Sequence, residues 1–195
     1  MAAVESRMLD LGTEAPDFNL PIANPEVDDI EGDHRSLDDY ADAEALVVMF
    51  ICNHCPYVHH VEPALLETAR VYGDRGAQFV AVCANDAEAY PDDRFEKMAE
   101  RAEEKGYPFP YLQDTTQDVA KAYQAACTPD FYVFDGDQTL VYRGRYDETR
   151  PNSGMPHGED LHAALDAVVN GGTVPEEQHP SMGCSIKWKP GNEPA

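Results

Sequence analysis

Basic residues are scarce in this chain. Only 14 of its 195 residues are Lys or Arg, against 37 Asp and Glu, so the formal net charge is −23 at pH 7. Nucleic-acid binders need a cationic surface that displaces counterions from phosphate, and anionic lipid surfaces attract basic segments for a related reason. The composition therefore excludes both classes, and we expect neither nucleic acid nor a membrane among the partners.

Long apolar runs are also missing. The longest, residues 45–51, is far shorter than the roughly 20 residues that span a bilayer. The opening residues 1–7 lack the apolar centre of a signal peptide. We therefore expect a cytoplasmic protein. In a reducing compartment the five cysteines favour catalysis or metal binding over a static disulfide framework.

The acidic residues are scattered rather than gathered in a tail. Examples are the pairs Asp28-Asp29 and Asp92-Asp93, which we interpret as part of an acidic surface. Such a surface repels itself in dilute buffer, and at about 1 M salt the Debye length falls to roughly 3 Å, which screens the repulsion. Scattered acidic residues and a low content of Lys resemble the composition of proteins from salt-accumulating organisms, so we expect a halophilic protein.

The hydrophobic pattern predicts one α/β domain. Apolar runs of strand length and segments with helical spacing alternate in the first half, which indicates a parallel sheet, and a later hairpin adds an antiparallel edge. We expect an N-terminal arm (1–12), one domain (13–172) and a C-terminal tail that packs on it (173–195). The predicted strands are 45–51, 79–84, 111–112, 131–134 and 139–143, and the predicted helices are 57–72, 92–105, 118–126 and 161–169.

Two cysteines separated by two residues lie between a buried strand and a helix. In Cys52-Asn53-His54-Cys55 this spacing lets the thiols close a short disulfide ring. The first thiol would face the free N–H groups at the helix start, which stabilise thiolate and lower the pKa of Cys52. The intervening Asn53 and His54 would adjust the pKa of Cys52. A protonated His54 adds positive charge and makes the dithiol–disulfide couple more oxidising.

Several segments together resemble a peroxiredoxin-like family of thioredoxin-fold proteins. Residues 12–20 (GTEAPDFNL) are similar to the start of alkyl-hydroperoxide-reductase-type peroxiredoxins, and Cys52 to Cys55 is similar to the thioredoxin dithiol. Residues 127–135 (CTPDFYVFD) resemble the segment that carries the cis-proline in thioredoxin-fold proteins. Residues 183–189 (GCSIKWK) also resemble the peroxiredoxin-like family. The resemblance implies a thioredoxin-like three-layer fold, with a central mixed sheet and helices on both faces. It also implies a cis Thr128–Pro129 bond, with Pro129 shaping a groove and Thr128 offering backbone groups to a partner strand.

The sequence departs from true peroxiredoxins around the attacked cysteine. Cys55 occupies that position, yet the Thr three residues earlier is Cys52 and the Pro seven residues earlier is Val48. Pro129 and its neighbours also supply no Arg to assist peroxide cleavage. The dithiol interpretation is therefore preferred. A thiol peroxidase in which Cys55 is attacked, with Cys52 or Cys184 resolving, is the alternative.

The preferred function is dithiol–disulfide exchange, with a possible antioxidant role. Cys52 thiolate would attack a protein or small-molecule disulfide and Cys55 would resolve the intermediate, with electrons exchanged with a cellular dithiol donor and no organic cofactor. Cys127, two residues before Pro129, and Cys184 in the tail are further redox candidates, and Cys83 is expected in the core.

A non-enzymatic alternative is a redox-inert or zinc-holding interaction domain. Its ligands would be Cys52, Cys55, His59 and His60, although they sit on one strand–helix junction rather than on two paired elements. We therefore assign no metal. His59 and His60 are otherwise expected as solvated helix residues.

Overall fold

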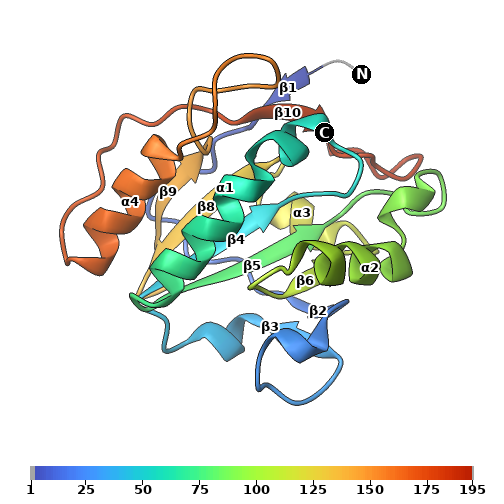
Figure 1. Cartoon of the computed structure of the whole chain (residues 1–195), viewed down its shortest axis with the longest axis horizontal. Coiled ribbons are helices and arrows are strands. Elements are labelled where there is room, and N and C mark those ends of the chain that lie inside the picture. The colour runs from blue at the N-terminus through green and yellow to red at the C-terminus, as the bar shows by residue number, and fades with distance from the viewer. Residues whose placement is uncertain (1–2, 195) are drawn as a thin grey trace.

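A computed structural model describes residues 3–194. The helices are α1 (Pro56–Gly73), α2 (Phe95–Lys105), α3 (Asp118–Ala122) and α4 (Glu159–Val169). The strands are β1 (Ala3–Glu5), β2 (Asn19–Pro21), β3 (His34–Ser36), β4 (Ala45–Phe50), β5 (Ala77–Cys83), β6 (Tyr111–Gln113), β7 (Cys127–Thr128), β8 (Asp130–Asp135), β9 (Leu140–Gly144) and β10 (Met182–Ser185). Figure 1 shows their arrangement.

A five-stranded sheet in the order β6-β5-β4-β8-β9 forms the centre of the molecule. β4, β5 and β6 are parallel, whereas β8 pairs antiparallel with β4 and β9 pairs antiparallel with β8. Every residue of β4 is buried, and its side chains alternate between the two faces, with Val47 in one core cluster and Val48 in the other. An unbroken apolar run is what a strand covered on both faces requires.

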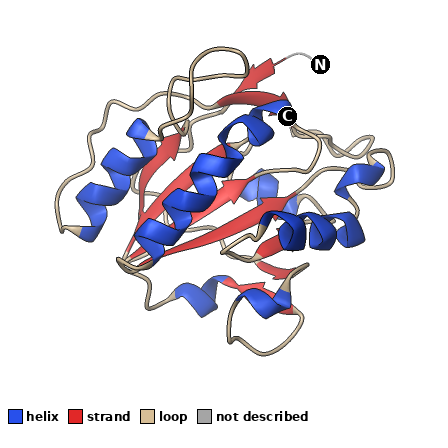
Figure 2. Cartoon of the chain, viewed as in Figure 1, coloured by secondary structure: helices blue, strands red, loops and turns tan. Residues whose placement is uncertain are grey.

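Helices cover both faces of this sheet. The cluster on one face includes Leu65 of α1, Met98 of α2 and Leu165 of α4, whereas the other includes Val119 of α3. Figure 2 shows α1, α2 and α4 in front of the strands and α3 behind them. The predicted mixed sheet between helical layers is therefore confirmed.

The predicted helices differ from the observed ones in detail. α1 begins at Pro56 and continues past Pro63 without interruption, because Pro63 lies on the exposed face, where water can reach the carbonyl left without an N–H donor. The segment predicted as the start of α2 is a separate 3₁₀ turn, Pro91–Asp93. α2 ends at Gly106, which adopts the left-handed conformation (φ 64°) that favours glycine. α3 covers only five residues.

A second sheet joins both ends of the chain to the loop before Pro129. β10 lies between β1 and β7 and pairs antiparallel with both, so that Cys184 is opposite Ala3 on one side and Thr128 on the other. In Figure 1 β1 and β10 lie side by side at one end of the molecule, above α1. None of these three strands was predicted, because their pairing joins residues more than 50 positions apart.

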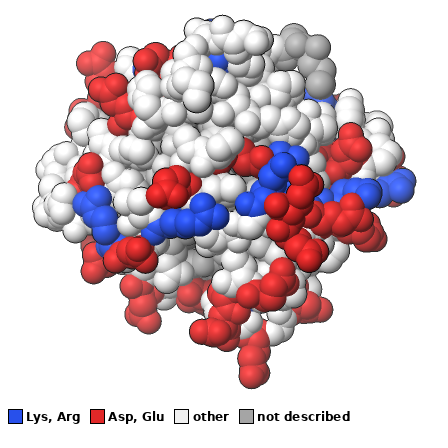
Figure 3. Space-filling view, viewed as in Figure 1, with Lys and Arg blue, Asp and Glu red and all other residues white. Residues whose placement is uncertain are grey.

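The surface is acidic, with basic side chains embedded among acidic ones (Figure 3). The ion pairs at the surface include Arg75–Asp166, Lys97–Glu100 and Lys105–Glu104. One residue counted above with this surface is not part of it: Asp93 is fully buried. Among residues 3–194 no helix is long and apolar enough to cross a membrane.

Candidate active site

The two cysteines lie where the carboxyl end of β4 meets the start of α1. Cys55 is the N-cap of α1 and has extended backbone angles (φ −84°, ψ 120°), while Pro56 takes the first helical position. Proline is favoured there because its missing N–H would be unpaired in any case. The free N–H groups of the first turn therefore point toward Cys55 rather than Cys52. Both thiols are buried, with 1% of Cys52 and none of Cys55 exposed.

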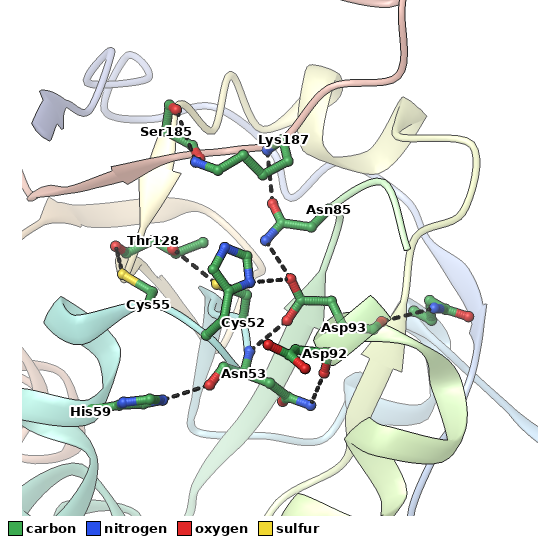
Figure 4. Close-up of polar contacts among 12 residues, drawn as sticks. Cys52, Asn53, Cys55, His59, Asn85, Asp92, Asp93, Thr128, Ser185 and Lys187 are labelled. Carbon is green, nitrogen blue, oxygen red and sulfur yellow. Dashed lines mark hydrogen bonds and ion pairs between the residues drawn. The ribbon is translucent and has the colours of Figure 1, made fainter. Parts of the chain in front are cut away.

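The loop before Pro129 faces this pair of thiols. The Thr128–Pro129 bond is cis, which confirms the prediction. The Sγ of Cys52 lies 3.4 Å from the hydroxyl oxygen of Thr128, and the Cys55 thiol donates to the Thr128 carbonyl at 3.1 Å (Figure 4). Thr128 therefore contacts both sulfur atoms, one through its side chain and one through its backbone.

The two thiols have opposite acidities, and the order is the reverse of the predicted one. A hydrogen bond with Cys52 lowers the pKa of Cys55 to about 4 against the opposing effect of burial, helped by Thr128, Cys184 and the Val58 N–H. The same hydrogen bond raises the pKa of Cys52, as do burial and the negative charge of Asp93. The first proton to leave the pair is therefore that of Cys55. The lower pKa thus falls on Cys55, the N-cap of the helix, rather than on Cys52 as expected from the sequence.

A buried carboxylate organises the residues between the cysteines. Asp93 accepts the Asn53 backbone N–H at 2.7 Å, and its other oxygen lies 2.6 Å from His54 Nδ1. Tyr111 donates its hydroxyl to the Asn53 side chain at 3.0 Å. The Nε2 atom of His54 is buried and has no hydrogen-bond partner among the described residues.

The same carboxylate is connected to the C-terminal tail. Asn85, which follows β5, donates to Asp93 at 2.9 Å and accepts the Lys187 backbone N–H at 2.8 Å. Lys187 also donates its ammonium to the Ser185 carbonyl at 2.6 Å (Figure 4). Sequence reasoning missed Asp93, Asn85 and Lys187, since only the fold brings these distant segments together.

The tail covers the backbone edge that was predicted to receive a partner strand. β10 pairs with β7, and Cys184 is directly opposite Thr128. Cys184 is 4% exposed and packs in the same core cluster as Cys52 and Cys55. The interpretation of Thr128 as an open docking edge is therefore wrong in this structure, because the chain itself fills the edge.

The remaining two cysteines are inert by their surroundings. Cys127 lies in β7, contacts the Pro129 carbonyl at 3.7 Å, and has a pKa raised by burial and by the charge of Asp130. Cys83 is a buried residue of β5 whose pKa is also raised by burial. Cys83 thus lies in the core as expected, and the Cys127 thiol is directed at the Pro129 carbonyl.

The zinc ligand set considered above is not assembled. His59 contacts the Asn53 carbonyl, and His60 lies 2.9 Å from the Thr149 hydroxyl, so neither is directed at the thiols. Among the described residues the potential ligands that converge are instead Cys52, His54 and Asp93, and a second group, Asp147, Glu148 and His157. The first group shares its thiol with the dithiol pair, so metal binding and disulfide formation there exclude one another.

Comparison with known proteins agrees with this geometry. The family described as AhpC/TSA matches residues 11–143. Two solved structures cover nearly all of the chain. An uncharacterized conserved protein from Geobacillus kaustophilus is 55% identical, covers 97% of this chain and 98% of its own, and has a TM-score of 0.91. A hypothetical protein from Sinorhizobium meliloti 1021 is 44% identical, covers 96% and 99%, and has a TM-score of 0.90.

A more distant structure carries a functional title. The thioredoxin domain of a thiol-disulfide oxidoreductase from Bacteroides vulgatus is 22% identical, covers 74% of this chain and 92% of its own, and has a TM-score of 0.56. At this identity the match shows the thioredoxin-like fold alone. No curated protein matches the chain.

Proposed function

Because the chain belongs to the AhpC/TSA family, we propose that it is a thiol–disulfide oxidoreductase whose Cys52 and Cys55 cycle between dithiol and disulfide. One observation carries the proposal: both thiols converge on Thr128 and the cis Pro129 at the N-terminus of α1. We place the reaction in a reducing cytoplasm, with protein or small-molecule disulfides as substrates and a cellular dithiol as the electron donor.

The acidities assign the order of attack. Cys55 thiolate attacks a substrate disulfide, which forms a mixed disulfide and releases the first substrate thiolate. Cys52 then loses its proton and attacks Cys55, which releases the second substrate thiolate and leaves the Cys52–Cys55 disulfide. A donor dithiol reverses these steps. This order exchanges the roles predicted from the sequence, because the thiolate is held at Cys55.

Because β10 covers the edge of β7, it restricts which disulfide substrates can reach the site. A partner strand cannot pair with Thr128 unless β10 leaves, and β10 is paired along both of its edges. Small disulfides need no such edge. The arrangement therefore favours low-molecular-weight disulfides over extended protein segments.

Hydroperoxide reduction is a second candidate, favoured by the low pKa of Cys55 at the position of the attacked cysteine. Cys55 thiolate would attack the O–O bond to give a sulfenic acid and an alcohol, and Cys52 would displace water to form the disulfide. Stopped-flow oxidation by hydroperoxide tests this candidate. A rate no faster than that of a free thiol would exclude it.

Equilibration in glutathione buffers tests the main proposal. We expect the reduced protein to form a reversible Cys52–Cys55 disulfide, seen by mass spectrometry after alkylation, at a defined ratio of oxidised to reduced glutathione. A Cys83→Ala variant is the matched control and should titrate at the same ratio. Absence of the Cys52–Cys55 pair at every ratio would contradict the proposal.

Replacing His54 or Asp93 should shift the reduction potential in opposite directions. His54→Gln leaves the Asp93 charge without its imidazole partner, which disfavours thiolate and makes the couple more reducing. Asp93→Asn removes a negative charge beside the dithiol, which favours the thiolate form of the pair and makes the couple more oxidising. Each unit of thiol pKa corresponds to about 30 mV for a two-electron couple. Shifts of the same sign would mean that these residues act only through packing.

A further inference from the structure

We propose that Cys184 is a third redox thiol of this site, held by β10 where the sulfur of a partner strand would otherwise lie, and that it exchanges with Cys55. The proposal rests on the proposed dithiol function. Its geometric basis is the antiparallel register of Cys184 with Thr128, whose carbonyl accepts from the Cys55 thiol, and the packing of Cys184 and Cys55 in one core cluster. Three of the five cysteines thus lie against the same residue, Thr128.

The tail is anchored on both sides of Cys184. Before it, the Ser181 hydroxyl donates to the Pro129 carbonyl at 2.6 Å. After it, the Ile186 N–H donates to the Ala126 carbonyl at 3.0 Å. These bonds attach β10 to the loop that faces the dithiol, so Cys184 is fixed relative to Cys55 rather than carried on a free end.

A glycine next to Cys184 permits this close approach. A Cβ atom at Gly183 would lie 1.9 Å from the Thr128 carbonyl oxygen and 2.7 Å from its carbon, far inside contact distance. Thr128 is the residue whose carbonyl and hydroxyl contact Cys55 and Cys52. The absence of a side chain at Gly183 therefore brings Cys184 and the dithiol against the same residue.

The exchange is balanced within the chain. A substrate disulfide first oxidises the pair to the Cys52–Cys55 disulfide, as proposed above. Cys184 then loses its proton and its sulfur attacks Cys55, so that the Cys55–Cys184 bond forms and the Cys52–Cys55 bond breaks. Cys52 leaves as thiolate and takes up a proton. No further oxidant is consumed, and the disulfide moves from the Cys52–Cys55 pair to the Cys55–Cys184 pair.

The charge on Cys55 controls when Cys184 can react. Burial and the hydrogen bond and negative charge of Cys55 raise the pKa of Cys184 to about 12. While Cys55 is a thiolate, Cys184 is therefore a protonated donor that stabilises it. Once Cys55 is part of a neutral disulfide that charge is gone, and Cys184 becomes easier to deprotonate. The attack is thus confined to the oxidised state.

The direct test uses the Cys52→Ser variant, which lacks the competing resolving thiol. After exposure to bis(hydroxyethyl) disulfide and alkylation of free thiols, disulfides are mapped by mass spectrometry. We expect a Cys55–Cys184 disulfide, formed also when Cys127→Ala is added. In Cys52→Ser/Cys184→Ser we expect the hydroxyethyl adduct to remain on Cys55. Cys184 recovered as a free thiol in Cys52→Ser, whatever the state of Cys55, overturns the proposal.

A second measurement does not depend on the folding of Cys52→Ser. In oxidised wild-type protein we expect both the Cys52–Cys55 and the Cys55–Cys184 pairs, whereas Cys184→Ser shows only the first. Gly183→Ala, which displaces β10, should lose the Cys55–Cys184 pair and keep the Cys52–Cys55 pair. Wild-type protein that shows Cys52–Cys55 alone refutes the role of Cys184 and leaves the dithiol function standing. Failure to form either pair refutes the dithiol function itself.

Discussion

Replacing Cys55 with serine is expected to abolish turnover of a disulfide substrate. The reacting species in thiol–disulfide exchange is the thiolate, and the site lowers the pKa of Cys55 to about 4 while raising that of Cys52. Loss of the nucleophile should reduce the rate of reduction of bis(hydroxyethyl) disulfide to background, a loss on the order of 10³-fold or more.

The matched variant Cys52→Ser should behave differently. Its Cys55 thiolate still attacks, so a first equivalent of substrate thiol per chain is released in a burst, and a second follows when Cys184 resolves the mixed disulfide, after which steady-state turnover slows. The released thiol is measured by rapid quenching. If Cys52→Ser loses the burst and Cys55→Ser keeps it, the order of attack is the one first expected from the sequence, and the assignment made from the helix cap is wrong.

Raising the salt concentration should stabilise the fold markedly. The chain has a net charge of −23, and its acidic side chains far outnumber the basic ones available to pair with them. Between about 0.01 M and about 1 M salt the Debye length falls from roughly 30 Å to roughly 3 Å, which removes most of the repulsion between exposed carboxylates.

We expect the melting temperature to rise by about 5–10 °C over this range, since a gain of 1 kcal/mol corresponds to about 2–4 °C in a chain of this size. Calorimetric melts in sodium chloride and in potassium chloride provide the measurement. Screening should produce most of the rise below about 0.5 M, whereas exclusion of salt from the protein surface keeps increasing stability above it. A flat or falling melting temperature would remove the halophilic interpretation.

Local patterns were sufficient for the central part of the fold. The apolar run ending at Ile51, the dithiol and the helix after it follow from hydrophobic spacing, and the cis Pro129 followed from the family resemblance. The helix cap was also within reach of the sequence, because Pro56 marks a first helical position and so makes Cys55 the N-cap. The spacing of the apolar residues alone predicts a helix start at Tyr57, one residue after the observed start at Pro56.

The parts that were missed depend on contacts between distant segments. Asp93 belongs to an acidic run whose composition predicts an exposed position. Only the fold brings it into contact with Asn53 and His54. The strand around Cys184 has a glycine and polar neighbours instead of a strand pattern, and it forms because β1 and β7 provide partners on both sides. Pairing of this kind leaves no local periodicity from which to predict it.

The most direct test of the account is a titration of thiolate absorbance in the reduced protein and its two single variants. Wild-type protein should show a thiolate that is already formed at about pH 6, far below the roughly 8.5 of a free cysteine. Cys55→Ser should show no thiolate below about pH 8. In Cys52→Ser the low midpoint should persist, because the serine hydroxyl can replace the Cys52 thiol as hydrogen-bond donor to Cys55. A low-pH thiolate that persists in Cys55→Ser and vanishes in Cys52→Ser would contradict the assignment of Cys55 as the reacting thiolate.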